Sequence, residues 1–439
     1  MVAWTTFGFA GLYPATLIVP GVILALLALH YRPWSYRDRA PSAVDAWMIV
    51  ALGAIALQLV TLPAAVIDTI SSAARPVWEQ RLLRVPSALP ISLDPQRTWR
   101  ALMLTAGSFL VFMTARKMFE TGGVRLVLRG VAVIGMLLAA IALAQEATAN
   151  GLMYWRYKPL DEGPPPFGPF VNRNHFATWA ILAIPMCLGY LTAHSAAHRQ
   201  REGSLLPLRR RLVLFFDGRA MALTTAACLL LVALVMTLSR SGLLGIATAA
   251  GAGLLLRAGR QTTNGRAIWW IASGAVAVVG LTLAQLSPAA LGLRLSTFRV
   301  SAGNRMLIWN DTLPILRDFW LTGTGAGTYL TSMLVYQRTS PGWLYNQAHN
   351  HYVQIASEGG LLVGVPVLLG LIALTLAAWR RLAADKSGMY WVRAGAFCGL
   401  CGVAAQSFWE TGLTMPANAA LAAIAAAIVL HDPPAQARD

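Results

Sequence analysis

Apolar blocks of roughly twenty residues alternate with short polar connections along nearly the whole chain. A helix needs about twenty apolar residues to cross the ~30 Å hydrocarbon layer of a bilayer. The blocks lie at 7–29, 44–70, 99–115, 124–146, 176–194, 220–238, 241–256, 268–287, 361–379, 394–409 and 417–430. The pattern therefore predicts an all-α integral membrane protein with roughly eleven transmembrane helices, between about ten and twelve. We expect one polytopic membrane domain over residues 1–439.

Composition and charge narrow the class of protein. The chain is 56% hydrophobic and only 12% charged, whereas a soluble domain carries about 25% charged residues. A soluble enzyme is therefore excluded. The formal net charge of +17 fits basic loops that face anionic membrane lipids, and we expect membrane lipids rather than nucleic acid as partners.

Four cysteines lie inside the apolar blocks, where a disulfide between loops is not expected. Cys398 and Cys401 form a C-x-x-C motif, which could indicate a redox or metal site. Gly395, Gly399 and Gly402 lie beside them, and small residues on one face let helices approach closely in a membrane. We therefore interpret the motif as a helix-packing surface.

Lysine and arginine residues in the short loops indicate the orientation, because they are enriched on the cytoplasmic side. When the loop after the first block is placed in the cytoplasm, most of the 35 lysines and arginines fall on that side. Three long loops then face outward, at 71–98, 147–175 and 288–360. Long loops often carry function, so we expect residues 288–360 to form a large outer catalytic loop.

One position between two apolar blocks carries a cation. The chain is apolar from Ala220 to Leu256 except for Ser239-Arg240-Ser241-Gly242. A single helix of that length would measure about 55 Å, too long for one bilayer, so the chain should turn back at Arg240. Arg240 is either an arginine that snorkels to the interface or a functional cation.

The longest outer loop combines arginines with histidines. Its arginines are Arg294, Arg299, Arg305, Arg317 and Arg338. A guanidinium group binds a phosphate or diphosphate bidentately, although the same charges could meet lipid headgroups. His349 or His351 could accept a proton from a sugar hydroxyl, and Asn350 is a plausible N-cap for the helix that follows. The H-x-H spacing also permits a metal pair, but no cysteine or assured carboxylate ligand lies nearby, so we expect no metal.

Several segments together resemble one known family. They are Gly303-Asn304-Arg305 with Trp309, Gly323-Thr324-Gly325-Ala326-Gly327-Thr328-Tyr329, and His349-Asn350-His351-Tyr352-Val353-Gln354 with Glu358-Gly359. Their order and spacing resemble the signature region of the O-antigen ligase and O-antigen polymerase superfamily. Ser239-Arg240 and Asn172-Arg173-Asn174-His175-Phe176-Ala177 are similar to further elements of its members.

The resemblance implies a GT-C-like membrane glycosyltransferase of the bacterial inner membrane, with its active site facing the periplasm. The donor would be a glycan on undecaprenyl diphosphate, and the acceptor a hydroxyl of a glycan or of a lipid A core. His349 would be the essential residue, and Arg240 and Arg305 would hold the diphosphate. The resemblance also implies inversion at the anomeric carbon, with no metal and no cofactor.

Other residues and other functions stay open at this stage. His351, Asn350, Trp309, Asn172 and Asn174 could form a substrate loop, but the asparagine-rich run could equally cap a helix. The enzyme could be a ligase, a polymerase of O-antigen or exopolysaccharide, or a transferase acting on protein, working with other polysaccharide-assembly proteins. A transporter or flippase for anionic lipid-linked sugars is the alternative from another class, and a non-catalytic scaffold is a third reading.

Overall fold

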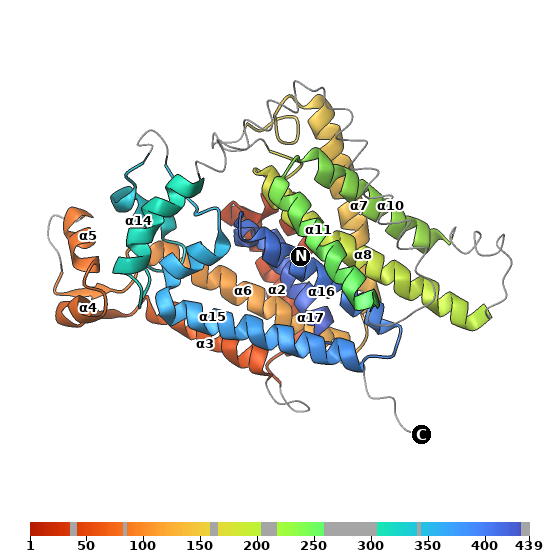
Figure 1. Ribbon diagram of the computed structural model, residues 1–439, viewed down its shortest axis with the longest axis horizontal. Helices are drawn as coiled ribbons and strands as arrows, with labels where there is room; N and C mark the ends of the chain where they lie inside the picture. The colour runs from red at the N-terminus through yellow and green to blue at the C-terminus, as the bar shows by residue number, and fades with distance from the viewer. Residues whose placement is uncertain are drawn as a thin grey trace.

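The computed structural model describes residues 1–35, 42–81, 86–158, 166–202, 217–258, 305–339 and 344–431. The predicted span 268–287 and the first part of the predicted loop 288–360 lie outside these ranges, together with Arg294 and Arg299. The described residues are almost entirely helical (Figure 1). The one sheet within them pairs β1 (Thr61–Pro63) with β2 (Ala88–Pro90) in antiparallel register. The prediction of an all-α protein is confirmed.

Within the described ranges, seven helical segments are long and apolar enough to cross a membrane. They are Pro14–Tyr31, which includes α2 (Ile18–Tyr31), then α6 (Pro95–Glu120), α7 (Val124–Thr148), Arg173–Ala197 of α8 (Arg173–Glu202), α10 (Gly218–Met236), α11 (Arg240–Ala258) and α15 (His351–Ala384). Shorter apolar helices are α3 (Ala43–Leu57) and α17 (Pro416–Val429), and α16 (Met389–Gln406) precedes α17. The protein is a multi-pass membrane protein. The predicted number of about eleven spans stays a prediction, because the span predicted at 268–287 lies outside the described residues.

The predicted span 44–70 is wrong as a single helix, because α3 ends at Leu57. The buried Gln58 side chain donates from Nε2 to the carbonyls of Thr322 and Glu358, at 2.8 and 2.9 Å, and its Oε1 accepts from the amide of Ala326 at 3.0 Å. These bonds tie the chain to residues far away in sequence. The apolar residues that follow form β1 and then the short helix α4 (Ala64–Ile70).

Glycines bring α8 and α16 into close contact at the centre of the bundle. A Cβ on Gly395 would lie 2.3 Å from the carbonyl oxygen of Pro185, and one on Gly189 would lie 2.4 Å from that of Trp391. Such distances are too short for any side chain, so the two backbones touch directly. Cys398 and Cys401 are free thiols on this helix. The packing interpretation of the glycines around the C-x-x-C motif is therefore confirmed.

A second group of elements lies beside the apolar bundle, at one end of the long axis (Figure 1). It contains α4, α5 (Ala74–Arg81), a helix over residues 305–318 and α14 (Tyr329–Tyr336). We call it the α4–α14 cluster. Its own core includes Ile67, Val77, Ile315, Phe319 and Tyr329. The described parts of the predicted loops 71–98 and 288–360 thus pack on one another.

Helix α15 is broken once, at Gly360, where φ is 54° and ψ is −155°. The amides of Leu361 and Leu362 donate to the carbonyls of Trp320 and Leu321, at 2.8 and 2.9 Å. A Cβ on Gly323 would lie 2.2 Å from the carbonyl oxygen of Glu358. The glycine-rich segment 323–327 is therefore needed for close backbone approach to α15, which agrees with our interpretation of it as backbone rather than a nucleotide loop.

Candidate active site

A buried carboxylate lies between two histidines and an arginine. Glu410, in the turn after α16, is 1% exposed. Its Oε1 lies 3.6 Å from Nδ1 of His349 and 3.7 Å from Nε2 of His175, and its Oε2 lies 4.0 Å from Nη2 of Arg305. These four residues come from separate regions of the sequence. The fold therefore assembles a polar site that no local motif contains.

Backbone bonds around the turn hold these segments together. The amide of His351 donates to the carbonyl of Ser407 at 2.8 Å, which joins the start of α15 to the turn. The Asn418 side-chain amide donates to the carbonyls of His175 and Gly412, at 2.9 and 2.8 Å, which joins α17 and the start of α8. Glu410 is therefore fixed from three sides, and so is the position of any group that faces it.

His349 occupies an unusual backbone conformation. Its φ is 48°, in the left-handed region that few residues other than glycine adopt. Asn350 follows and caps α15, because its Oδ1 accepts from the amides of Tyr352 and Val353, at 3.0 and 3.1 Å. The predicted N-cap is confirmed. Strained backbone held by such bonds is common at functional sites.

Trp309 supports the same loop. Its indole Nε1 donates to the carbonyl of the buried Ala348 at 2.9 Å, one residue before His349. The indole thereby fixes the chain that carries the imidazole. His351 points its backbone amide at Ser407 and takes part in no ion pair within the described residues. Of the two histidines in the H-x-H pair, His349 is the one that faces Glu410.

We expect Trp309→Phe to lower the rate of catalysis about tenfold and to lower the melting temperature by a few degrees. The buried carbonyl of Ala348 would lose its donor, which costs about 1–3 kcal/mol. Thermal unfolding and steady-state kinetics would measure both effects. Trp320→Phe, on the exposed surface of the same cluster, serves as the matched control. An unchanged melting temperature with a raised KM would show instead that Trp309 contacts substrate.

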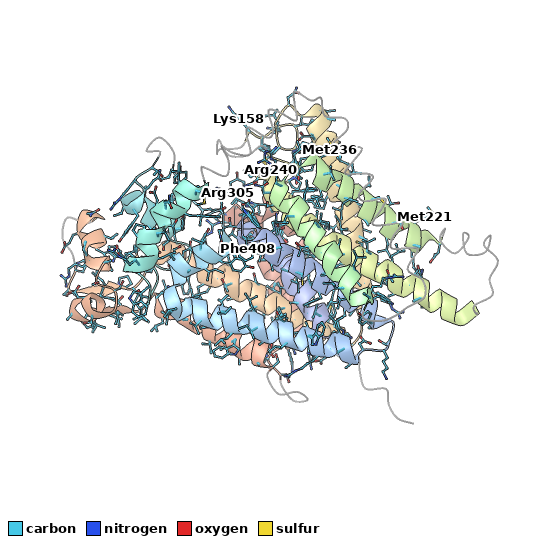
Figure 2. The ribbon with its side chains drawn as sticks, viewed as in Figure 1. Lys158, Met221, Met236, Arg240, Arg305 and Phe408 are labelled. Atoms are coloured by element: carbon cyan, nitrogen blue, oxygen red, sulfur yellow. The ribbon has the colours of Figure 1, made fainter. Side chains whose placement is uncertain are left out.

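Two arginines lie near this carboxylate. Arg240 is the first residue of α11, and Arg305 is the first described residue of the helix over 305–318; Figure 2 shows them close together near Phe408. Burial lowers the pKa of Arg305, the carboxylate of Glu410 opposes that shift, and the positive charge of Arg240 adds to it. Both guanidinium groups remain charged at neutral pH. The site thus carries two fixed cations within reach of one another.

The predicted hairpin at Arg240 is confirmed. Helix α10 ends at Met236 and α11 begins at Arg240. Leu238 between them has a φ of 55°, and the Ser239 hydroxyl accepts from the amide of Gly242 at 3.1 Å. The turn closes on α8, since a Cβ on Gly242 would lie 2.7 Å from the Cβ of Ala177.

Charge at the site favours an anion. Burial would raise the pKa of Glu410, but the interactions with His175 and His349 outweigh it and hold the pKa well below its usual value. The ionised carboxylate offsets only part of the positive charge. Helices α8, α11 and α15 also begin here, and helix N-termini carry partial positive charge. Phosphate groups bind such an arrangement readily.

The asparagine-rich run has a structural role and adds a residue that we did not predict. The Asn172 side chain accepts from the amide of Asn174 at 2.8 Å, as a helix cap does, and the carbonyl of Asn174 accepts from Gln406 at 3.2 Å. His175 in the same run faces Glu410. Glu410 was missed as well, although it is the one charged residue between positions 394 and 430, in the connection between two predicted spans, a position that suggests function.

No group of three or more His, Cys, Asp or Glu within the described ranges is arranged to hold a metal ion. The side chains present at the site are imidazoles, guanidinium groups and a carboxylate, which are acid–base and charge-stabilising groups. Proton transfer at an imidazole and binding of a phosphorylated group are the chemistry that these residues can supply.

A family model described as O-antigen ligase matches residues 225–368. The matched region contains six of the candidate site residues named from the sequence: Arg240, Arg305, Trp309, His349, Asn350 and His351. The resemblance to this superfamily is confirmed over that region. A comparison with curated protein sequences finds no match.

Proposed function

We propose that this membrane protein transfers a glycan from undecaprenyl diphosphate to an acceptor hydroxyl at the periplasmic face of the inner membrane. The match of residues 225–368 to a family model described as O-antigen ligase supports this proposal. The family supports glycan transfer in O-antigen assembly in general terms. The contact between the His349 imidazole and the buried Glu410 carboxylate, beside two arginines, is the observation on which the proposal rests.

In the proposed reaction His349 is the general base. Its Nδ1 faces the ionised Glu410 at 3.6 Å, which favours the tautomer with the proton on Nδ1. The other ring nitrogen, Nε2, then carries the lone pair and accepts the proton of the acceptor hydroxyl. The hydroxyl oxygen attacks the anomeric carbon as the proton leaves. Glu410 stabilises the imidazolium that forms.

The leaving group is a lipid diphosphate. As the bond from the anomeric carbon to the diphosphate oxygen breaks, that oxygen gains negative charge. Arg240 and Arg305 supply fixed positive charge at this place, and preorganised charge of this kind is a large contributor to enzymatic rate. Attack from the opposite side of the sugar ring inverts the anomeric centre, and no step requires a metal.

A transporter or flippase is the alternative from another class of protein. A transporter or flippase usually places charged groups at mid-membrane, whereas the charges here lie at helix starts and in the turn after α16. This favours transfer over transport. Ligase, polymerase and protein-directed transferase share the same chemistry, and they differ in the acceptor.

The experiment supplies purified protein in detergent with a synthetic undecaprenyl-diphosphate oligosaccharide and an acceptor pool, with EDTA present. We expect release of undecaprenyl diphosphate and a glycosylated product. A ladder of products indicates a polymerase, and one discrete conjugate indicates a ligase. Bound donor without any release would contradict the proposal and favour transport, and activity that EDTA abolishes would contradict the metal-free mechanism.

A further inference from the structure

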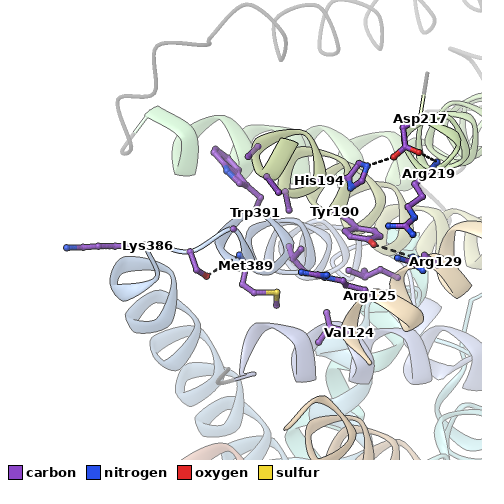
Figure 3. Close-up of a pocket in the computed structure, with 17 residues that line it drawn as sticks. Val124, Arg125, Arg129, Tyr190, His194, Asp217, Arg219, Lys386, Met389 and Trp391 are labelled. Carbon is purple, nitrogen blue, oxygen red and sulfur yellow. Dashed lines mark hydrogen bonds and ion pairs between the residues drawn. The ribbon is translucent and has the colours of Figure 1, made fainter. Parts of the chain in front are cut away.

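A polar cavity lies at the end of the helices opposite to the candidate active site. It has a volume of about 840 Å³ and lies where α7 and α10 begin, where α8 ends, and where α15 passes into α16 (Figure 3). His175 at the candidate active site and His194 in this cavity are both on α8. Nineteen residues of helix separate them, or about 28 Å, close to the ~30 Å hydrocarbon thickness. The two places therefore belong to opposite faces of the bilayer.

The cavity is strongly basic. Among the residues that the structure describes, Arg125, Arg129, Arg219 and Lys386 line it, and Asp217 is the one lining carboxylate. Asp217 accepts a hydrogen bond from His194 at 2.6 Å, and this bond lowers the pKa of Asp217, so the carboxylate is ionised. Four cations against one paired anion leave a concave surface with a net positive charge.

One of these cations is held in position, and the walls between the cations are apolar. Nε of Arg129 donates to the hydroxyl of the buried Tyr190 at 3.3 Å. Leu128, Met389 and Val392 line the cavity between the charged groups, and the indole of Trp391 borders it. A tryptophan at the end of a membrane helix is typical of the level where lipid headgroups lie.

We propose that this cavity binds the phosphate headgroup of an anionic phospholipid. The arginines match a phosphodiester, and the apolar wall suits the glycerol and upper acyl carbons that a free phosphate ion lacks. Basic pockets between membrane helices bind lipid headgroups in this manner. The inference does not depend on the proposed function, because neither the cavity nor its charges belong to the candidate active site.

The alternative is that these residues only orient the chain, as basic residues at cytoplasmic helix ends do. Orienting the chain in the membrane requires positive charge at that end of the helices, but no particular arrangement of the charged side chains. Binding a lipid headgroup requires the charged side chains that face into the cavity. Arg380, an exposed arginine near the end of α15, lies outside the lining residues and therefore separates the two explanations.

The test is native mass spectrometry of the full-length protein in detergent, titrated with phosphatidylglycerol and with phosphatidylcholine of the same chains. We expect wild type to retain phosphatidylglycerol in preference. Arg125→Gln and Arg129→Gln should each weaken that binding about tenfold, the loss of one charge-assisted contact, while Arg380→Gln should leave it unchanged. Melting temperatures without added lipid would show that each variant is folded.

Two results would overturn the proposal. Equal phosphatidylglycerol retention by both cavity variants and by Arg380→Gln would place the lipid elsewhere. A third arm adds inorganic phosphate as competitor. If phosphate alone binds wild type and displaces the lipid, and Arg125→Gln weakens the phosphate, the cavity takes a soluble anion and not a headgroup.

Discussion

His349→Asn is expected to reduce glycan transfer about a thousandfold while leaving the protein folded. The variant removes the imidazole that faces Glu410, and general-base catalysis contributes about 10²–10⁴ to rate. Asparagine is chosen because it tolerates the left-handed backbone that His349 adopts, with φ 48°. Release of undecaprenyl diphosphate under single-turnover conditions would measure the effect, because donor binding is then separated from the chemical step.

His351→Asn is the matched control for this variant. The two histidines are separated by one residue, but the contact that His351 makes with Ser407 uses its backbone amide and not its ring. We therefore expect His351→Asn to retain activity within about tenfold. The reverse result, with His351 essential and His349 dispensable, would refute the assignment of the base.

Glu410→Gln is expected to lower the rate of transfer by about 10²–10³. The amide keeps the shape of the side chain but removes the negative charge that faces Arg305 and the imidazoles of His175 and His349. Removing a carboxylate that orients a catalytic imidazole has large effects on rate. A purely structural role for Glu410 would lower the melting temperature without lowering the rate per folded molecule.

The stability effect of Glu410 has a defined sign. The pKa of Glu410 is depressed in the folded protein. The ionised carboxylate therefore adds to the free energy of unfolding above the pKa of the unfolded chain, about 4.3. This contribution is lost as the pH falls through the lower pKa of the folded protein. The melting temperature of wild type should therefore exceed that of Glu410→Gln at neutral pH and approach it in acid. Glu410→Asp keeps the charge and should restore part of the activity. A Gln variant with the wild-type rate would refute this role.

Features that depend on chain length or on neighbouring residues could be predicted from the sequence. The turn at Arg240 followed from the length of the apolar stretch, since no single helix fits it. The cap at Asn350 followed from the residue type and the helix after it. Both features depend on residues that are close together in the sequence, so the same physical reasoning applies to them in any fold.

The centre of the site could not be predicted in this way. Glu410 and His175 are brought together only when α16 and α8 pack through Gly395 and Gly189. The end of α3 was missed for a similar reason, because Gln58 is held by carbonyls more than 260 residues away along the chain. Hydropathy counts apolar residues and contains no information about such partners.

The break in α15 at Gly360 separates two mechanical parts of one helix. Residues before it carry the loop of His349 and are bonded to Glu410's turn, while residues after it form the long apolar segment. Membrane helices tilt when bilayer thickness changes, at a modest cost per ångström of mismatch. The freed amides of Leu361 and Leu362 donate to the carbonyls of Trp320 and Leu321, just after the helix over 305–318. We therefore expect a change in tilt of the long segment to bend the chain at Gly360, and the contact between the imidazole and its carboxylate to be kept in membranes of different thickness.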